Sequence, residues 1–175
     1  METNWKIDNL HSSVGFKVRH MMISNVSGTF GNISAEATTN GDDFTTARMN
    51  FKAAIDTINT GVADRDAHLK SADFFDVANH PELLFHSTGV RQVASDELEI
   101  SGEMTIHGVT KPVSLKAEFA GIAVDPYGQT KAGLSVTGKI KRSDFGLTWS
   151  AVTEAGNIVV GDEIKLECEI QLIKQ

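Results

Sequence analysis

Apolar and polar residues alternate along most of this chain with a period of two. Every second residue is apolar between Ala47 and Ile55. The same alternation recurs in five other runs: 14–22, 98–106, 113–119, 132–140 and 164–172. A period of two is typical of a β-strand with one face buried and the other in water. Strands of this kind favour antiparallel pairing, in which one face of the sheet can stay solvated.

Two weaker alternating runs, 28–38 and 83–90, bring the expected number of strands to about eight. Turn sequences separate the runs: Asn40–Asp43, the HGVTKP stretch 107–112, and Asp125–Gly128. About eight strands in short succession predict an all-β, antiparallel up-and-down barrel, whose closure removes exposed strand edges. A sandwich of two sheets is the alternative. No internal repeat interrupts the pattern, so residues 1–175 are expected to form a single domain.

The inward faces of these strands mix large and small side chains. The large ones include Phe16, Phe51, Met104, Phe119 and Leu134, and the small ones Ala47, Ala53, Gly102, Ala117, Ala132 and Gly138. An eight-stranded barrel can either be filled by its own side chains or hold one small ligand. Two interpretations therefore stay open: large and small residues interlock across the barrel, or the small positions leave an apolar cavity.

The stretch DRDAHLKSADFFDVANHPELLFHST, residues 64–88, breaks the alternation. Asp64 is expected to cap a helix, and Asp66 would favour the positive N-terminus of that helix. The pair His80–Pro81 ends helical geometry, because the residue before a proline is pushed out of the α region. We therefore expect a short, broken helix between strands three and four. A connection of this length is too long for a hairpin loop and is typical of a lid.

The same stretch contains acids and histidines that could carry chemistry. Asp66 and His68 offer an acid and a base, yet two residues that are two apart on a helix point in different directions. No serine or cysteine stands in a nucleophile elbow. Asp64 and His68 lie one helical turn apart and His80 precedes His86 by six residues, but no HExxH or comparable metal motif is present. We expect no catalytic residues, no metal site and no cofactor.

Composition excludes several classes of partner. The formal net charge is −7, which disfavours nucleic acids and anionic lipid surfaces. The single cysteine, Cys168, excludes an internal disulfide and a cysteine-based zinc site; it lies on an inward face and is expected to be an inert core thiol. The start METNWKIDNL lacks the features of a signal peptide. We therefore expect a cytoplasmic protein, or a periplasmic one if a leader has been removed.

Four ordered motifs carry a family resemblance: WKIDNLHSSVGFKVRH, TGVADRDAHLKSADFFDVANHPELLFHST, GEMTIHGVTKPVSL and KRSDFGLTW followed by VGDEIKLECEIQL. On these motifs the chain resembles the YceI-like family of bacterial polyisoprenoid-binding proteins. The resemblance implies a lipocalin-like antiparallel barrel with a helical insertion after the third strand. It also implies a long apolar ligand inside the barrel: a polyisoprenoid, an isoprenoid quinone or a fatty-acid derivative.

We therefore expect a non-enzymatic protein that carries or sequesters an apolar lipid, as in lipid transport or a stress response. The alternatives are a lipid-modifying enzyme and a ligand-free, stress-related interaction module. The residues expected to line the hydrophobic pocket are Phe16, Val18, His20, Met22, Met49, Phe51, Leu69, Phe74, Phe75, Phe85, Met104 and Leu134. The residues expected at the mouth, near a headgroup, are Arg65, His68 and Arg142.

The nature of the headgroup follows from charge. A pyrophosphate needs several cationic groups, whereas the expected inward faces carry few. A quinone ring needs only one or two hydrogen-bond donors, and His20 can supply one. The sequence therefore favours an isoprenoid quinone or another uncharged lipid over a prenyl pyrophosphate. It leaves a homodimer open and gives no indication of nucleic-acid binding.

Overall fold

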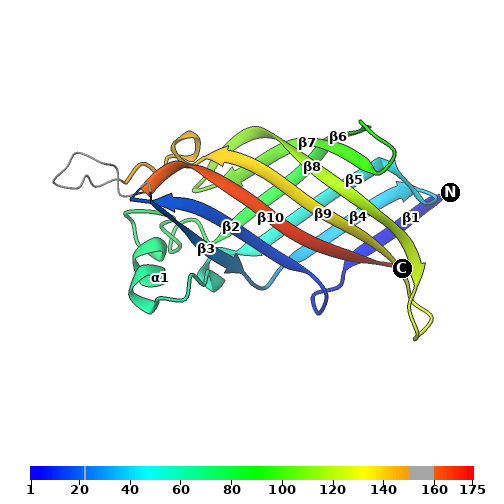
Figure 1. Ribbon diagram of the computed structural model, residues 1–175, viewed down its shortest axis with the longest axis horizontal. Helices are drawn as coiled ribbons and strands as arrows, with labels where there is room; N and C mark the ends of the chain where they lie inside the picture. Colours follow the sequence, from blue (N-terminus) through cyan, green and yellow to red (C-terminus); the bar gives the residue numbers. More distant parts are fainter. Residues whose placement is uncertain (22, 150–159) are drawn as a thin grey trace.

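The computed structural model describes residues 1–21, 23–149 and 160–175. In these residues the chain forms a single closed β-sheet with short helices at one end (Figure 1). The strands are β1 (Glu2–Ile7), β2 (Ser13–His20), β3 (Ser24–Phe30), β4 (Ser34–Asn40), β5 (Asp43–Ala54), β6 (Glu82–Gln92), β7 (Glu97–Ile106), β8 (Val109–Val124), β9 (Thr130–Lys141) and β10 (Val160–Lys174). The helices are the 3₁₀ turns η1 (Ile55–Thr57) and η2 (Arg142–Phe145) and the α-helix α1 (Ala63–Lys70).

Strand pairing closes the sheet into a barrel. β1 and β2 follow each other along the same edge of β10: Trp5 lies opposite Lys174, and Ser13 opposite Glu169. In the next position around the barrel, β4 pairs with β1 and β3 pairs with β2. β1 and β2 therefore act as one interrupted strand, and β3 and β4 act as another. When each interrupted strand is counted once, the described residues form a closed antiparallel barrel of eight strands in which each strand pairs with the next along the chain.

The expected eight-stranded, all-β antiparallel barrel is thus confirmed, but the expected position of the helical insertion is wrong. In the numbering of the ten strands given above, α1 does not lie between β3 and β4; it follows β5 and precedes β6. The alternation count missed β1, in which Trp5 is the only fully buried residue. It also merged β3 and β4, which are separated by a break at Asn32, a residue with a positive φ of 47°.

The inward faces predicted from alternation are buried or half-buried, most clearly in β7, where Leu98, Ile100, Gly102, Met104 and Ile106 alternate with more exposed residues. Neighbouring side chains occupy the space above several small inward positions, as shown by the clash that an added Cβ would make. At Gly102 it would meet the Phe85 ring, at Gly28 the Phe16 ring, and at Gly138 the Leu115 side chain. Large and small residues therefore interlock in part of the barrel.

The two ends of the barrel are closed differently. At the end that holds both termini (Figure 1), the aromatic rings of Trp5, Phe44 and Phe119 stack in a row, with centroid separations of 5.1 and 4.9 Å. Trp5 is 1% exposed, and its Nε1 donates a hydrogen bond to Thr39 at 2.8 Å. The opposite end carries residues 59–81, called the α1 segment below, which lie outside the sheet.

Candidate functional site

An apolar cavity of about 130 Å³ lies inside the barrel. On β10 its wall runs from Leu166 to Leu172, a stretch of about 20 Å of extended strand. Apolar residues from nine strands line it: Val14, Phe30, Ala35, Ala37, Met49, Phe51, Leu83, Phe85, Ile100, Met104, Leu115, Leu134, Val136, Leu166, Ile170 and Leu172. The interlocking described above therefore leaves a space along the axis of the barrel.

Over the part of the chain that the structure describes, the inward-facing wall of this cavity carries no charge. Glu36 and Asn50 border it, but both are exposed and alternate with inward-facing neighbours, so their polar groups lie on the outer face of the sheet. Cys168 also lines the cavity, and burial raises the pKa of its thiol to about 11, which keeps the thiol protonated near neutral pH. The wall can exclude water from an apolar chain by burial, and the described residues that line it include no ionised nucleophile or general base.

The structure places the twelve predicted pocket residues in three groups. Those that line the cavity are Met49, Phe51, Phe85, Met104 and Leu134. Those that are buried or half-buried elsewhere are Phe16, Val18, His20, Leu69, Phe74 and Phe75. Met22 lies outside the described residues. Ala35 and Ala37 of β4 are lining residues that the sequence analysis missed, because the run 28–38 alternates weakly.

The α1 segment contacts a residue of the cavity wall through Phe75. The Phe75 ring meets Phe30 edge-on, with centroids 6.4 Å apart, and Phe30 in turn lies 5.5 Å from Phe16. Because Phe30 lines the cavity, its ring forms part of the cavity wall, and the Phe75 ring packs against it from the α1 segment. Leu69 and Val77 of the same segment also pack against the core.

Phe74 points away from the Phe75 cluster, although the two residues are adjacent. It is buried against His68 and Trp149, with ring centroids 5.2 Å away in each case. His68 and Trp149 themselves meet edge-on at 4.9 Å, and His68 Nε2 lies 3.0 Å from the Asp73 carboxylate. One face of the α1 segment therefore covers the barrel, and the other packs against Trp149.

Arg65 and Asp66 link helix α1, through Thr60, to the point where the segment is attached to the barrel rim. The Asp66 carboxylate accepts hydrogen bonds from the Thr60 backbone N–H, at 2.9 Å, and from the Thr60 hydroxyl. Arg65 donates to the Thr60 hydroxyl at 2.8 Å and to its carbonyl at 2.7 Å. Thr60 follows Asn59, which exchanges two backbone hydrogen bonds with Thr29 of β3. The Arg65 guanidinium thus has partners within the protein.

The expectation that Asp64 caps the helix is wrong. Val62 is the N-cap residue, and no side chain makes a capping hydrogen bond there. The carboxylate of Asp66, in the first turn, instead reaches back to Thr60. This bond joins the first turn to a residue before the N-cap and so holds the start of the helix in place of a side-chain cap.

Arg142 is a buried structural residue. Its guanidinium donates to the carbonyl oxygens of Leu147 and Trp149, both at 2.7 Å, of Gly161 at 2.9 Å and of Val160 at 3.2 Å. Burial lowers its pKa. These bonds join the segment after η2 to the start of β10. The guanidinium of Arg142, which was expected at the mouth of the pocket, is therefore hydrogen-bonded to backbone carbonyls.

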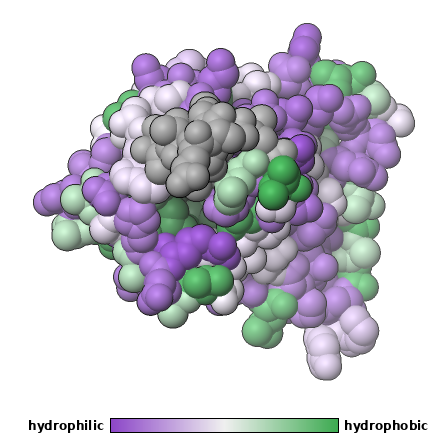
Figure 2. Space-filling model, turned by 60° about the vertical axis from the view of Figure 1, so that its left-hand side comes forward, coloured by the Kyte–Doolittle hydropathy of each residue, from purple (hydrophilic) through white to green (hydrophobic). Residues whose placement is uncertain are grey.

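Figure 2 looks toward the α1 end and shows a mostly hydrophilic surface, with apolar residues visible in a hollow beside the grey residues. Among the described residues, no helix has the length and apolar character needed to cross a membrane. The candidate site is therefore an internal apolar cavity with a polar exterior at the end that carries the α1 segment.

Comparison with known proteins agrees with this arrangement. The chain is 35% identical to Protein YceI of Salmonella newport over 173 residues, which is 98% of this chain and 87% of that protein. The solved YCEI protein of Campylobacter jejuni is 31% identical, with a TM-score of 0.77 over 87% of each chain. A polyisoprenoid binding domain from Saccharophagus degradans has the same fold, with 14% identity and a TM-score of 0.70 over 98% of each chain.

The YceI-like domain matches residues 5–172, which is nearly the whole chain. The four motifs, the closed barrel and the 35% identity to the Salmonella protein all point the same way. The chain belongs to the YceI-like family.

Proposed function

We propose that this barrel binds the apolar chain of a lipid, as a carrier or sequestering protein, and performs no chemistry on it. The observation that carries the proposal is the uncharged, apolar cavity lined by residues from nine strands. The shared fold of the Saccharophagus degradans domain, which is described as polyisoprenoid-binding, supports an isoprenoid as the apolar part.

The size of the cavity defines how such a ligand would enter. At about 130 Å³ it is smaller than the roughly 300–1,000 Å³ of typical ligand pockets. A long chain is therefore accommodated only if lining side chains change rotamer. Met49 and Met104 are suited to this, since unbranched thioether chains adapt to irregular spaces. At about 0.3 kcal/mol per heavy atom for a large ligand, affinity should increase with chain length until the cavity is full.

A neutral headgroup fits the α1 end better than a pyrophosphate does. Arg65 bonds Thr60, His68 pairs with Asp73, and Arg142 donates to backbone carbonyls. Recruiting any of them to an anion would break an existing bond. An uncharged group such as a quinone ring needs only one or two donors, so we propose an isoprenoid quinone or another uncharged isoprenoid lipid as the ligand.

The decisive experiment for lipid binding is native mass spectrometry of protein purified from its own host, followed by lipid extraction. Ala37→Leu, which adds apolar volume to the cavity wall, should lower the lipid load at least severalfold while the protein stays folded. Ala120→Leu adds the same volume at an exposed position of β8 and should leave the load unchanged. Equal lipid loads in both folded variants would contradict binding in the cavity.

The headgroup is tested by comparing a quinone with the prenyl pyrophosphate of the same chain length, at low and high salt. Binding of the quinone should be tighter and insensitive to salt, because screening weakens only charge–charge attraction. Tighter pyrophosphate binding that falls steeply with salt would show a cationic mouth and contradict the proposed headgroup.

A further inference from the structure

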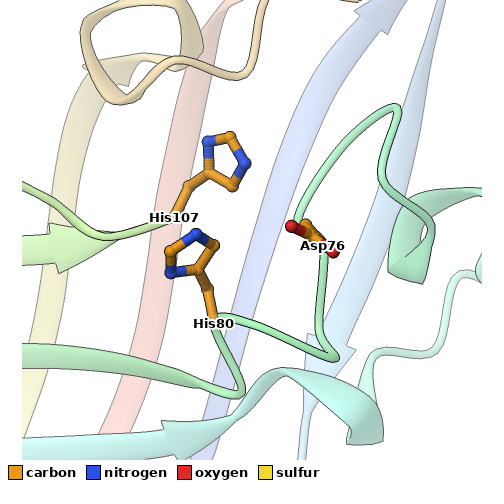
Figure 3. A group of neighbouring side chains, drawn as sticks. All are labelled: Asp76, His80 and His107. Atoms are coloured by element: carbon orange, nitrogen blue, oxygen red, sulfur yellow. The ribbon is translucent and has the colours of Figure 1, made fainter.

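Three side chains with metal-binding groups meet between the α1 segment and the barrel rim. Asp76 and His80 belong to the α1 segment, and His107 stands in the two-residue turn between β7 and β8. One potential ligand atom from each residue lies within 4.8 Å of the other two, and all three residues are half-buried. In Figure 3 both imidazole rings and the carboxylate border the same space.

The backbone fixes Asp76 and His80 relative to each other. The Asp76 carbonyl accepts hydrogen bonds from the backbone N–H groups of Asn79, at 3.0 Å, and His80, at 2.9 Å. The Asp76 N–H donates to the Ser71 carbonyl at 2.9 Å. These bonds form a tight turn, and Asn79 Nδ2 donates to Asp76 Oδ2 at 2.8 Å. Because this hydrogen bond uses Oδ2, the other carboxylate oxygen of Asp76, Oδ1, can bind another partner.

The ring of His107 is oriented by a backbone carbonyl. His107 Nδ1 lies 3.3 Å from the Phe145 carbonyl oxygen, which can only accept a hydrogen bond. That contact therefore requires the proton on Nδ1 and leaves Nε2 with a free lone pair. Protein metal sites commonly orient a histidine ligand in this way, through a second-shell bond from its other ring nitrogen.

Two glycines leave room for the imidazole rings. A Cβ on Gly108, where φ is +71°, would lie 2.8 Å from the His80 ring. A Cβ on Gly146, where φ is +74°, would lie 3.2 Å from His107 Nδ1. The two rings themselves are 5.0 Å apart between centroids. Larger residues at either glycine would displace one of the potential ligands.

We propose that Asp76, His80 and His107 bind a divalent transition-metal ion of the Zn²⁺ type and that this ion fastens the α1 segment to the β7–β8 turn. Two imidazoles and one carboxylate, with water in a fourth position, form a common zinc donor set. Mg²⁺ and Ca²⁺ prefer all-oxygen sites. Tetrahedral ligand atoms at zinc distances lie roughly 3.4 Å apart, so binding draws the three groups closer together.

This site differs from the sequence-based expectation of no metal. His80 and His107 are separated by the whole of β6 and β7, so no short sequence motif indicates the cluster. Only the antiparallel pairing of β6 with β7 returns the chain to the same end of the barrel and brings the β7–β8 turn next to His80.

The site is tested by calorimetric titration of ZnCl₂ into the full, EDTA-treated chain, with MgCl₂ as the comparison. One Zn²⁺ per chain should bind, without detectable Mg²⁺ binding. His80→Gln, Asp76→Asn and His107→Asn should each weaken zinc binding by at least about 100-fold, beyond the loss typical of a second-shell change. Asparagine is chosen for Asp76 and His107 because both have a positive φ, which asparagine tolerates.

His86→Gln is the matched control, because His86 is an exposed histidine on β6 that faces Glu103 outside the cluster. It should bind zinc as the unchanged protein does, and the unfolding transition of every variant shows whether it is folded. Absence of one-to-one zinc binding, or an equal loss in His86→Gln, would overturn the site. Retention of full affinity by folded His80→Gln would overturn it as well.

The fastening is tested by hydrogen exchange in residues 71–81. Zinc should slow exchange there in the unchanged protein but not in Asp76→Asn. Zinc binding without slower exchange would overturn the fastening and leave the metal site. Slower lipid release in the presence of zinc is a further expectation that rests on the proposed function. A protein that binds zinc but no lipid would contradict the proposed function alone.

Discussion

The two ends of this barrel are both closed by aromatic side chains, but these side chains are attached to the sheet in different ways. At the termini end, Trp5, Phe44 and Phe119 belong to the strands themselves, so their positions are fixed by strand pairing. At the α1 end, Phe75 belongs to a segment outside the sheet. The α1 end can therefore open without breaking the barrel, and the termini end cannot.

An ionic cluster reinforces the difference. Asp8, directly after β1, is 7% exposed and accepts a hydrogen bond from Lys131 of β9 at 2.7 Å. Lys131 also lies 3.3 Å from Asp125, and His11 lies 2.8 Å from Asp8. The bond from Lys131 is the main cause of an Asp8 pKa of about 2. This cluster joins the interruption between β1 and β2 to the β8–β9 connection.

The largest effect is expected at Trp5. Trp5→Ala removes a fully buried ring from a row of stacked rings and should lower the free energy of unfolding by about 3–5 kcal/mol, measured by urea denaturation. The fraction that remains folded should retain its lipid, because the α1 end is unchanged. Folded Trp5→Ala protein that loses lipid as readily as an α1-segment variant would show that the two ends are equivalent.

Cys168 provides a chemical probe of access to the cavity between the two ends. A rise in pKa from 9.0 to about 11 lowers the thiolate fraction near pH 8 by about 100-fold. Alkylation should therefore be about 100-fold slower in the folded protein than in urea, followed by mass spectrometry. Phe75→Ala should accelerate it by opening the α1 end. A folded-state rate equal to that in urea would contradict a buried, protonated thiol.

The two adjacent phenylalanines of the α1 segment are assigned different roles: Phe75 packs against the cavity wall, and Phe74 anchors the segment. Phe75→Ala should cost about 2 kcal/mol, less than the 3–5 typical of a fully buried ring, and should increase lipid release. Phe74→Ala should destabilise the α1 segment with a smaller effect on lipid, because Phe74 faces His68 and Trp149. Lipid extraction of both purified variants measures this; equal release would contradict the assignment.

The smallest effect concerns Asp8 and depends on pH. Its pKa is about 2 when folded and 3.8 as an ordinary value, so the unfolded chain binds this proton more readily. The stabilisation is therefore complete above about pH 4 and is lost as the pH falls toward 2. Asp8→Asn should cost about 1–2 kcal/mol at pH 7 and little at pH 2, as measured by denaturation at each pH. A cost that does not change with pH would contradict the ionic origin.

Much of the fold could be predicted because alternation reports which residues face inward. In β7 and β9, where the alternation is regular, the predicted faces are buried or half-buried. The interruptions between β1 and β2 and between β3 and β4 could not be predicted. They depend on tertiary partners such as the Asp8–Lys131 bond, and on the positive φ of Asn32. Because these interruptions were not predicted, the helix was expected after the third strand, whereas in the ten-strand numbering it follows β5.

The candidate site could be predicted less well, because it depends on side-chain direction outside regular strands. Sequence shows two adjacent phenylalanines, but only the fold shows that Phe75 meets Phe30 whereas Phe74 meets Trp149. An arginine near a strand end suggests a headgroup partner. The burial of Arg142 among carbonyl oxygens depends on two segments, one before residue 150 and one after residue 159, that come together only in the fold.

The pairing of β1 and β2 with β10 also has a consequence in time. These strands are separated by most of the barrel sequence, so their contacts cannot form until β10 has been synthesised. Such non-local pairing is associated with slow folding, on the order of milliseconds to seconds. Until closure, the edges of β9 and β2 present unpaired backbone groups to other chains. The newly made protein thus passes through a period in which aggregation competes with completion of the barrel.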